Sequence, residues 1–286
     1  MNKQTSAKLF LLTVLLTIPA FSVFAQTKEL LKRTTYKMDK LDFASAGTLV
    51  VVGAPSGSIS VEGWNKNEVE ISAEIEIQAE TESDIEQITA VTGFVLEESF
   101  ERTAIISVGV HDKKYLKDVA KRFPEHLVGL PFRIDYIIKV PQFCDLQIAG
   151  GNGDLYMSGV EGKIKINYLK GNARLHLIGG GIVGTFGSGS VEVSVLTRSR
   201  EGSIADIQLA TGTMNVSLPP SMHAELNASI LRTGKIENTY PDLKPRTKKN
   251  SVAGKLIAAK LGAGGRSMKF TVGDGTLNIF ELRKPE

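Results

Sequence analysis

The sequence predicts an all-β protein: a β-solenoid of the parallel β-helix type, with short glycine-cornered repeats and one or two small helices in its N-terminal half. Three observations predict this fold class. The 28 glycines among 286 residues accompany many β-branched residues, a composition typical of short strands and tight turns. Apolar and polar residues alternate from Val69 to Ala79, which puts the apolar side chains on one face of a strand. Glycine-led runs of alternating residues then recur from residue 146 onward.

Residues 1–25 have the features of a secretory signal peptide, with cleavage expected after Ala25. Lys3 and Lys8 precede an apolar run over 9–18 that is too short to span a bilayer comfortably. An uncleaved membrane anchor is the alternative. Beyond this segment no run of about 18 apolar residues occurs, so we expect no transmembrane span in the mature chain. The expected location is the periplasm, the outer cell surface or the extracellular space.

The charge balance gives no support to nucleic-acid binding. Loss of Lys3 and Lys8 with the signal peptide leaves 32 of the 34 basic residues against 31 acidic residues. The single cysteine, Cys144, excludes an intramolecular disulfide and a cysteine-cluster metal site. Its apolar neighbours predict that it is a small buried hydrophobe. We expect no cofactor.

After the signal peptide (1–25), the predicted organisation is a polar lead-in segment (26–45) and one repetitive β domain (46–286). Residues 46–145 form the less regular N-terminal part of that domain. Helical spacing there predicts one helix over 81–88, capped by Thr81 or Ser83, and a second over 112–127, ended by Pro124. Strands are predicted over 47–53, 58–64, 68–79, 93–97, 103–108 and 132–141.

Residues 146–286 are predicted to stack as repeats. Gly153, Gly162 and Gly171 stand nine residues apart, and each precedes a short alternating run. Each run has about three inward apolar residues, too few for a core of its own, so neighbouring runs must share one hydrophobic interior. An antiparallel β-sandwich with hairpin turns has similar strand lengths and spacing, and it remains the alternative fold.

Five basic residues of this part form a possible ligand-facing patch. Lys163, Lys165, Lys170, Arg174 and His176 alternate with the apolar residues of two successive runs. If neighbouring repeats align, these side chains share an outer face suited to an acidic glycan or to another envelope protein. A solvated lysine-rich face that prevents edge aggregation is the alternative interpretation.

No catalytic, metal-binding or cofactor-binding residue is predicted. Residues 179–184 match the spacing GxGxxG, but the glycine-rich sequence that follows does not favour the helix that a dinucleotide site requires, so a β-turn or bulge is expected. Asp154 follows a glycine pair as in calcium β-roll repeats, without their tandem spacing, and is predicted to form a turn. The four histidines lack a zinc-binding spacing.

Several stretches resemble the bacterial putative-adhesin family of exported proteins: residues 55–64 and 68–71, the strand end at 139–141, residues 151–162 and the closing run at 273–279. The resemblance covers roughly residues 45–285 and implies a repetitive β-helical fold and export, with no catalytic residues. We therefore expect a non-enzymatic cell-envelope protein, an adhesin or surface scaffold. A carbohydrate-active β-helix enzyme with carboxylates from different coils, or an envelope-stress accessory protein, is the alternative.

Overall fold

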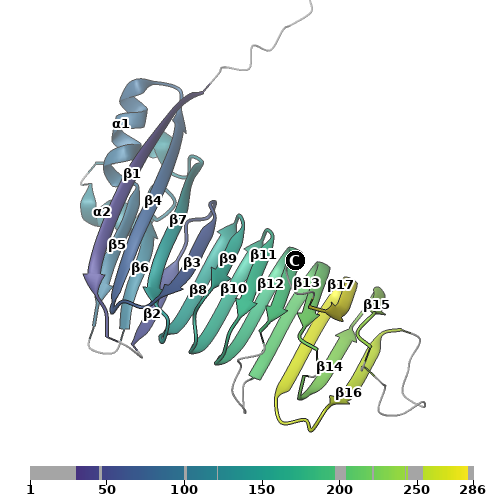
Figure 1. The fold of residues 1–286 in the computed structure, drawn as a ribbon. Coiled ribbons are helices and arrows are strands. Elements are labelled where there is room, and N and C mark those ends of the chain that lie inside the picture. The colour runs from purple at the N-terminus through teal and green to yellow at the C-terminus, as the bar shows by residue number, and fades with distance from the viewer. Residues whose placement is uncertain are drawn as a thin grey trace, which may run out of the picture.

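The computed structural model shows an elongated molecule in which two short helices lie beside one end of a long sheet (Figure 1). The residues that it describes are 30–44, 47–99, 102–120, 122–196, 204–220, 222–241, 243 and 254–282. The predicted signal peptide and residues 244–253 lie outside the described residues.

The N-terminal part carries both helices. Its elements are β1 (Leu31–Asp42), β2 (Thr48–Val52), β3 (Ile59–Trp64), β4 (Glu68–Ala79), α1 (Glu82–Val91), β5 (Gly93–Glu98), β6 (Arg102–Val108), α2 (Lys113–Val119), the 3-10 turn η1 (Glu125–Leu127) and β7 (Phe132–Pro141). Strand β1 lies inside the predicted lead-in segment. It pairs antiparallel with β4 over its whole length, so this segment belongs to the sheet.

In the second part, the regular elements of the described residues are all strands. They are β8 (Asp145–Asn152), β9 (Leu155–Ser158), β10 (Lys163–Lys170), β11 (Ala173–Leu177), β12 (Gly181–Val195), β13 (Ile204–Leu218), β14 (Ala224–Ile230), β15 (Gly234–Asn238), β16 (Leu256–Leu261) and β17 (Ser267–Glu281). Most of these strands pair in parallel. Ile164, for example, pairs with Leu146 on one side and with Ile182 on the other, a register of eighteen residues.

In most of the second part, and in β2–β3 of the N-terminal part, a glycine divides a strand or a strand pair into two limbs. We call each strand–glycine–strand unit a rung, with a first limb before the glycine and a second limb after it. The rungs are β2–β3, β8–β9, β10–β11, β12, β13, β17 and β14–β15. Strand β17 lies between β13 and β14, so the last strand of the chain is inserted between two earlier ones.

The predicted β-solenoid is wrong, and so is the alternative sandwich. All the strands belong to one 17-stranded mixed sheet. Antiparallel pairs join β1 to β4, β4 to β7 and β5 to β6 at one end, and β14 to β16 at the other. The glycine-led pattern that suggested a uniform parallel coil is confined to the rungs, and it does not reveal these antiparallel ends or the insertion of β17.

The corner glycines stack on one another along the sheet. A Cβ on Gly171 would lie 1.5 Å from the carbonyl oxygen of Gly153 in the preceding rung, and a Cβ on Gly189 would lie 1.9 Å from that of Gly171. Gly171 also has a φ of 148°, which other residues rarely adopt. Backbone conformation and space thus both require glycine here. The glycine column comprises Gly57, Gly153, Gly171, Gly189, Gly212, Gly275 and Gly234.

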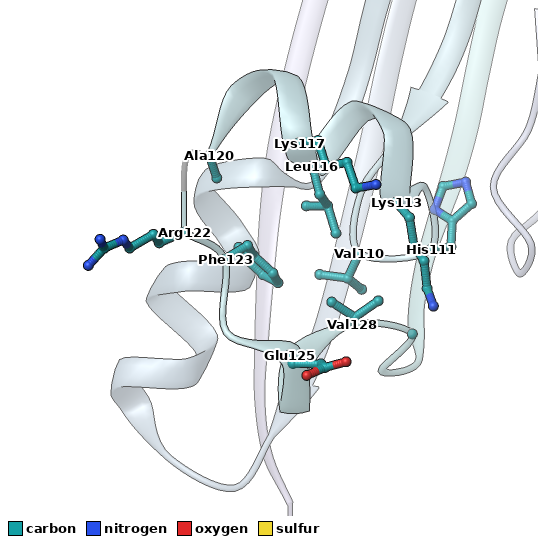
Figure 2. A pocket seen from close by; sticks show the side chains of 11 residues that line it. Val110, His111, Lys113, Leu116, Lys117, Ala120, Arg122, Phe123, Glu125 and Val128 are labelled. Atoms are coloured by element: carbon teal, nitrogen blue, oxygen red, sulfur yellow. The ribbon is translucent and has the colours of Figure 1, made fainter.

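The predicted helix over 112–127 is only partly formed. The side chain of Asp112 accepts hydrogen bonds from the N–H groups of Lys114 and Tyr115, which starts α2. The helix ends at Val119, and Pro124 precedes the separate turn η1. Helix α1 begins where it was predicted to begin, because Thr81 Oγ1 accepts from the N–H of Asp84. Figure 2 shows α2 above the segment that leads into η1.

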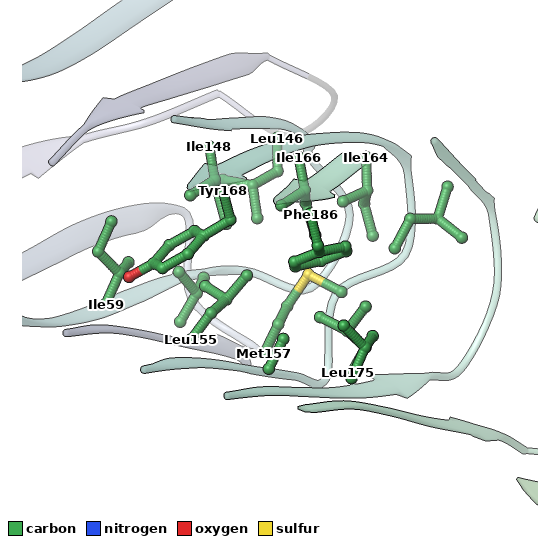
Figure 3. Packing of buried hydrophobic residues seen from close by; sticks show 14 of the residues in the cluster. Ile59, Leu146, Ile148, Leu155, Met157, Ile164, Ile166, Tyr168, Leu175 and Phe186 are labelled. Atoms are coloured by element: carbon green, nitrogen blue, oxygen red, sulfur yellow. The ribbon is translucent and has the colours of Figure 1, made fainter. Parts of the chain in front are cut away.

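The two limbs enclose one hydrophobic core. In Figure 3, Ile164 and Ile166 of β10 point toward Met157 of β9 and Leu175 of β11 across the interior. These side chains are at most 3% exposed and belong to a single cluster that runs through both parts of the molecule. The prediction that the short runs share one interior is therefore confirmed. Cys144 is buried in the same cluster, and burial raises the pKa of its thiol to about 12.

Candidate functional site

The outward side chains of the second limbs form two ladders across neighbouring rungs. The parallel register places Ser60, Tyr156, Arg174 and Glu192 side by side on β3, β9, β11 and β12. Each alternates with a buried residue of the same strand, which fixes its outward direction. Neighbouring strands lie about 4.8 Å apart, so the ladder presents one polar or aromatic side chain at each such step.

The second ladder consists of residues that come directly after glycines of the glycine column, and hydrogen bonds join neighbouring members of it. Asp154 donates its N–H to Ser58 Oγ at 3.2 Å. Its carboxylate accepts the backbone N–H of Asn172 at 3.0 Å and the side-chain amide of Asn172 at 3.2 Å. Asp154 therefore bridges two rungs, and the residue is exposed.

These two ladders line a shallow groove of about 370 Å³. We call it the polar groove. The residues that line it come from β3, β9, β11, β12 and the turns before them: Ser58, Ile59, Ser60, Asp154, Leu155, Tyr156, Asn172, Ala173, Arg174, Ser190 and Glu192. Most of the outward groups are hydroxyls, amides and charged groups, which can both donate and accept hydrogen bonds.

Tyr156 is the aromatic side chain of the polar groove. It is 39% exposed, and its ring meets the ring of His176 edge to face, with centroids 5.7 Å apart. On the next rung, Arg174 Nε lies 3.2 Å from a carboxylate oxygen of Glu192. Both partners are at least half exposed, so this ion pair positions the two side chains more than it stabilises the fold.

The predicted basic patch is divided between the two limbs. Lys163 and Lys165 are exposed on β10, which pairs with β8 and β12 in the first limbs. Arg174 and His176 lie on β11, which pairs with β9 and β12 in the second limbs. Lys170 stands at the corner, immediately before Gly171. The structure thus brings Arg174 and His176 together at Tyr156 and leaves the two β10 lysines on the other side of the core.

The other motifs of the sequence have structural roles. Gly181 and Gly184 lie within β12, and no helix follows them. Asp154 joins neighbouring rungs, as described above. Within the described residues, no three His, Cys, Asp or Glu side chains are close enough together to hold a metal ion. Nor does that part of the chain contain a helix of sufficient length and hydrophobicity to cross a membrane.

Tyr156 was not among the predicted site residues, although its sequence pattern marks it as an outward aromatic residue. Leu155 and Met157 flank it and are buried, so period-two alternation places Tyr156 outward. An aromatic side chain that faces the solvent beside the Gly153 turn is a candidate binding residue. What the sequence did not provide was the eighteen-residue register that brings Arg174 next to it.

Comparisons with known proteins give distant similarities. No protein-family model matches the chain, and no curated protein matches it. The chain is similar to a putative cell adhesion protein from Clostridium sporogenes, with 12% identity and a TM-score of 0.49 over 87% of this chain and 100% of that chain.

Two further solved structures are similar to this chain. For a putative adhesin from Parabacteroides merdae, the identity is 10% and the TM-score 0.32, over 85% of this chain and 80% of that chain. For a putative adhesin from Bacteroides fragilis, the values are 10% and 0.24, over 87% and 97%. All three proteins are named as putative adhesins or as a putative cell adhesion protein.

Proposed function

We propose that this chain is an exported, non-enzymatic protein of the cell envelope and that it binds glycan through the polar groove. The observation that carries the proposal is the pair of ladders, in which Tyr156 stands among Asp154, Asn172, Arg174 and Glu192. A sugar ring has an apolar face of C–H groups and a rim of hydroxyls. A partly exposed tyrosine suits the first, and amides, carboxylates and guanidinium groups suit the second.

The repeated geometry favours a polymer over a single sugar. Equivalent outward positions recur at every rung, and the polar groove crosses β3, β9, β11 and β12 at right angles to the strands. Successive sugar units lying across the strands would each meet a new polar side chain.

A binding role is also favoured over catalysis by the way the carboxylates are used. Glu192 is paired with Arg174, and Asp154 accepts hydrogen bonds from Asn172. A glycosidase-type general acid needs a carboxyl group with a raised pKa. Outside the groove, hydrogen bonds from Lys40 and Lys139 lower the pKa of Glu68 and Glu70, which keeps both ionised.

A glycan array tests the binding proposal. The purified protein should bind a subset of extended glycans, and Tyr156→Ala should weaken that binding about tenfold, the upper range for loss of one aromatic contact. The matched control is Tyr36→Ala, because Tyr36 is 70% exposed on β1, far from the groove. Equal binding by the two variants, or no binding to any glycan, would contradict the proposal.

Export is tested separately by fractionation of cells that carry a tagged chain. We expect a mature protein shortened by the first 25 residues in the envelope fraction or the medium. Protease added to intact cells should then degrade a surface-located protein. Complete protection from protease would exclude a role in adhesion, and recovery of the full-length chain in the cytoplasm would exclude export.

A further inference from the structure

A second hollow lies in the N-terminal part of the molecule, in the excursion between β6 and β7. It has a volume of about 630 Å³, within the range of small-molecule sites. The excursion is closed at its base, because the N–H of Gly129 donates to the carbonyl oxygen of Val110 at 2.8 Å. The hollow is therefore built by one continuous segment, which carries α2 and η1 (Figure 2).

The floor of this hollow is apolar and continuous with the core. Val110 is fully buried and Leu116 is 4% exposed, and both belong to the main hydrophobic cluster. Phe123 and Val128 are partly buried and pack against that cluster. In Figure 2 the side chains of Leu116, Val110 and Val128 point toward one another beneath α2. Part of this apolar surface lines an open hollow instead of being covered by protein.

The rim of the hollow is basic. Lys113, Lys117 and Arg122 line it and are exposed, and within the described residues none of them takes part in an ion pair. Glu125 is the carboxylate on the lining, so cations outnumber it by three to one. His111 adds an imidazole whose ring lies on that of Phe132, with centroids 5.2 Å apart. Burial lowers the pKa of His111, although Asp112 acts in the opposite direction, so the ring adds little charge at neutral pH.

We propose that this hollow binds a single-chain anionic amphiphile, namely a free fatty acid. The acyl chain lies on Val110, Leu116, Phe123 and Val128, and the carboxylate meets Lys113 and Lys117; Arg122 lines the hollow, but its side chain points away from these apolar residues in Figure 2. Apolar surface alone would accept any hydrophobic ligand, and unpaired cations alone would accept any anion. Their occurrence on one lining selects a ligand that has both features. This site is separate from the polar groove, and neither proposal depends on the other.

Three ligands distinguish the contribution of the apolar floor to binding from the contribution of the basic rim. Binding to the purified full chain is measured by calorimetry for dodecanoate, for dodecyltrimethylammonium and for inorganic phosphate, all below micelle-forming concentrations. We expect saturable binding of dodecanoate and about fourfold weaker binding for each methylene removed from its chain. The ammonium amphiphile should bind at least tenfold more weakly, and phosphate should show no measurable binding. Equal affinity for both amphiphiles, phosphate binding as tight as that of dodecanoate, or no binding of dodecanoate would overturn the proposal.

Charge reversal locates the site. Lys113→Glu combined with Lys117→Glu should weaken dodecanoate binding at least tenfold while circular dichroism and the unfolding midpoint stay unchanged. The control is Lys235→Glu combined with Lys260→Glu, on β15 and β16, which changes the net charge by the same amount at the far end of the sheet. The control variant should bind dodecanoate as the unmodified chain does. Equal losses in the two variants would show a general charge effect and reject the site.

Discussion

The two parts of the molecule hold their strands in register by different means. In the N-terminal part, ion pairs cross the β1–β4–β7 ribbon: Lys32 with Glu76, Lys40 with Glu68, and Lys139 with Glu70. In the rungs, the glycine column fixes the corners through backbone contacts that leave no room for a Cβ. Side-chain ion pairs thus add to the backbone pairing of the ribbon, whereas close backbone contacts constrain the corners of the rungs.

This difference predicts unequal tolerance to substitution. A solvent-exposed ion pair contributes little, because water and salt screen it and both side chains lose freedom when they meet. A corner glycine has no substitute, because the neighbouring carbonyl occupies the place of its Cβ. Substitution of a column glycine should therefore destabilise the rungs strongly. Each substitution of an ion-pair residue in the ribbon should cost only a little stability. The following predictions test that contrast in order of decreasing effect.

The largest effect is expected for Gly171→Ala. The added Cβ would lie 1.5 Å from the carbonyl oxygen of Gly153, so the rung has to move. We expect a loss of about 5 kcal/mol or more in the free energy of unfolding, measured by urea denaturation. The matched control is Gly265→Ala, since Gly265 also has a positive φ, of 103°, but has no atom near its Cβ position. It should lose only about 1–2 kcal/mol, the cost of the backbone conformation. Equal losses in the two variants would remove the argument for the column.

The next largest loss of stability is expected for a core substitution on the inserted strand β17, which tests whether this strand holds the C-terminal rungs together. Phe270 is fully buried on β17, between β13 and β14. Phe270→Ala should cost about 3–5 kcal/mol, from lost burial and the cavity left behind. Phe280→Ala is the control on the same strand, where the ring is only partly buried. If the two substitutions cost the same in thermal unfolding, the core at β17 is not closely packed.

The sequence predicted the strands that show period-two alternation, but it did not predict which strands pair with one another. Alternation located β4, β7 and most rung strands, because one buried face imposes period two wherever it occurs. The nine-residue spacing of Gly153, Gly162 and Gly171 is half of the structural unit. Gly153 and Gly171 belong to the glycine column, whereas a Cβ on Gly162 would meet the carbonyl of Cys144 at the opposite turn. Pairing partners depend on three-dimensional contacts, so the antiparallel ends and the place of β17 were not predictable.

The same distinction applies to the sites. Arg174 and His176 were selected from their alternation, and both lie beside Tyr156 in the second limb. Lys163 and Lys165 satisfied the same pattern but lie on the other side of the core. The chain turns at Gly171, between these two lysines and Arg174. Strand β1 was missed because nine of its twelve residues are exposed and none is buried, so the sequence shows no buried alternation; its pairing with β4 is what makes it a strand.

A smaller loss of stability is expected when a buried tyrosine of either part is replaced with phenylalanine. Tyr136 of β7 shares a 2.7 Å hydrogen bond with the buried hydroxyl of Ser107, and burial raises the pKa of Tyr136 to about 12. Tyr136→Phe leaves that serine without its partner and should cost about 1–3 kcal/mol. Tyr168 of β10 donates to the carbonyl of Asp154 at 3.2 Å, and this carbonyl already accepts the N–H of Ile59. Tyr168→Phe should therefore cost less than about 1 kcal/mol. A reversed order in the unfolding midpoints would contradict this account.

The smallest effect concerns the ion pairs of the ribbon in acid. Hydrogen bonds from Lys40, Lys139 and Lys32 lower the pKa of Glu68, Glu70 and Glu76 from the ordinary value of 4.5. A carboxyl group with a lowered folded-state pKa stabilises the protein in full above its unfolded value, and that contribution is lost as the pH falls through the folded value. Stability should therefore decline below about pH 4.5, and replacing all three residues with Gln should flatten this decline.

The control for this experiment changes the same kind of charge outside the ribbon. Glu97 and Glu98 of β5 are exposed and take part in no ion pair within the described residues. Their replacement with Gln should leave the acid slope of the urea midpoint as it is in the unmodified chain. The rungs contain Asp274, whose pKa is lowered by hydrogen bonds from Arg232 and Thr233, but the ordinary value for Asp, 3.8, is below that of Glu, 4.5, so acid should weaken the β1–β4–β7 ribbon before the rungs. Hydrogen exchange at pH 4 should then show earlier loss of protection in β1 than in β12, and simultaneous loss in both strands would show that the two parts unfold as one.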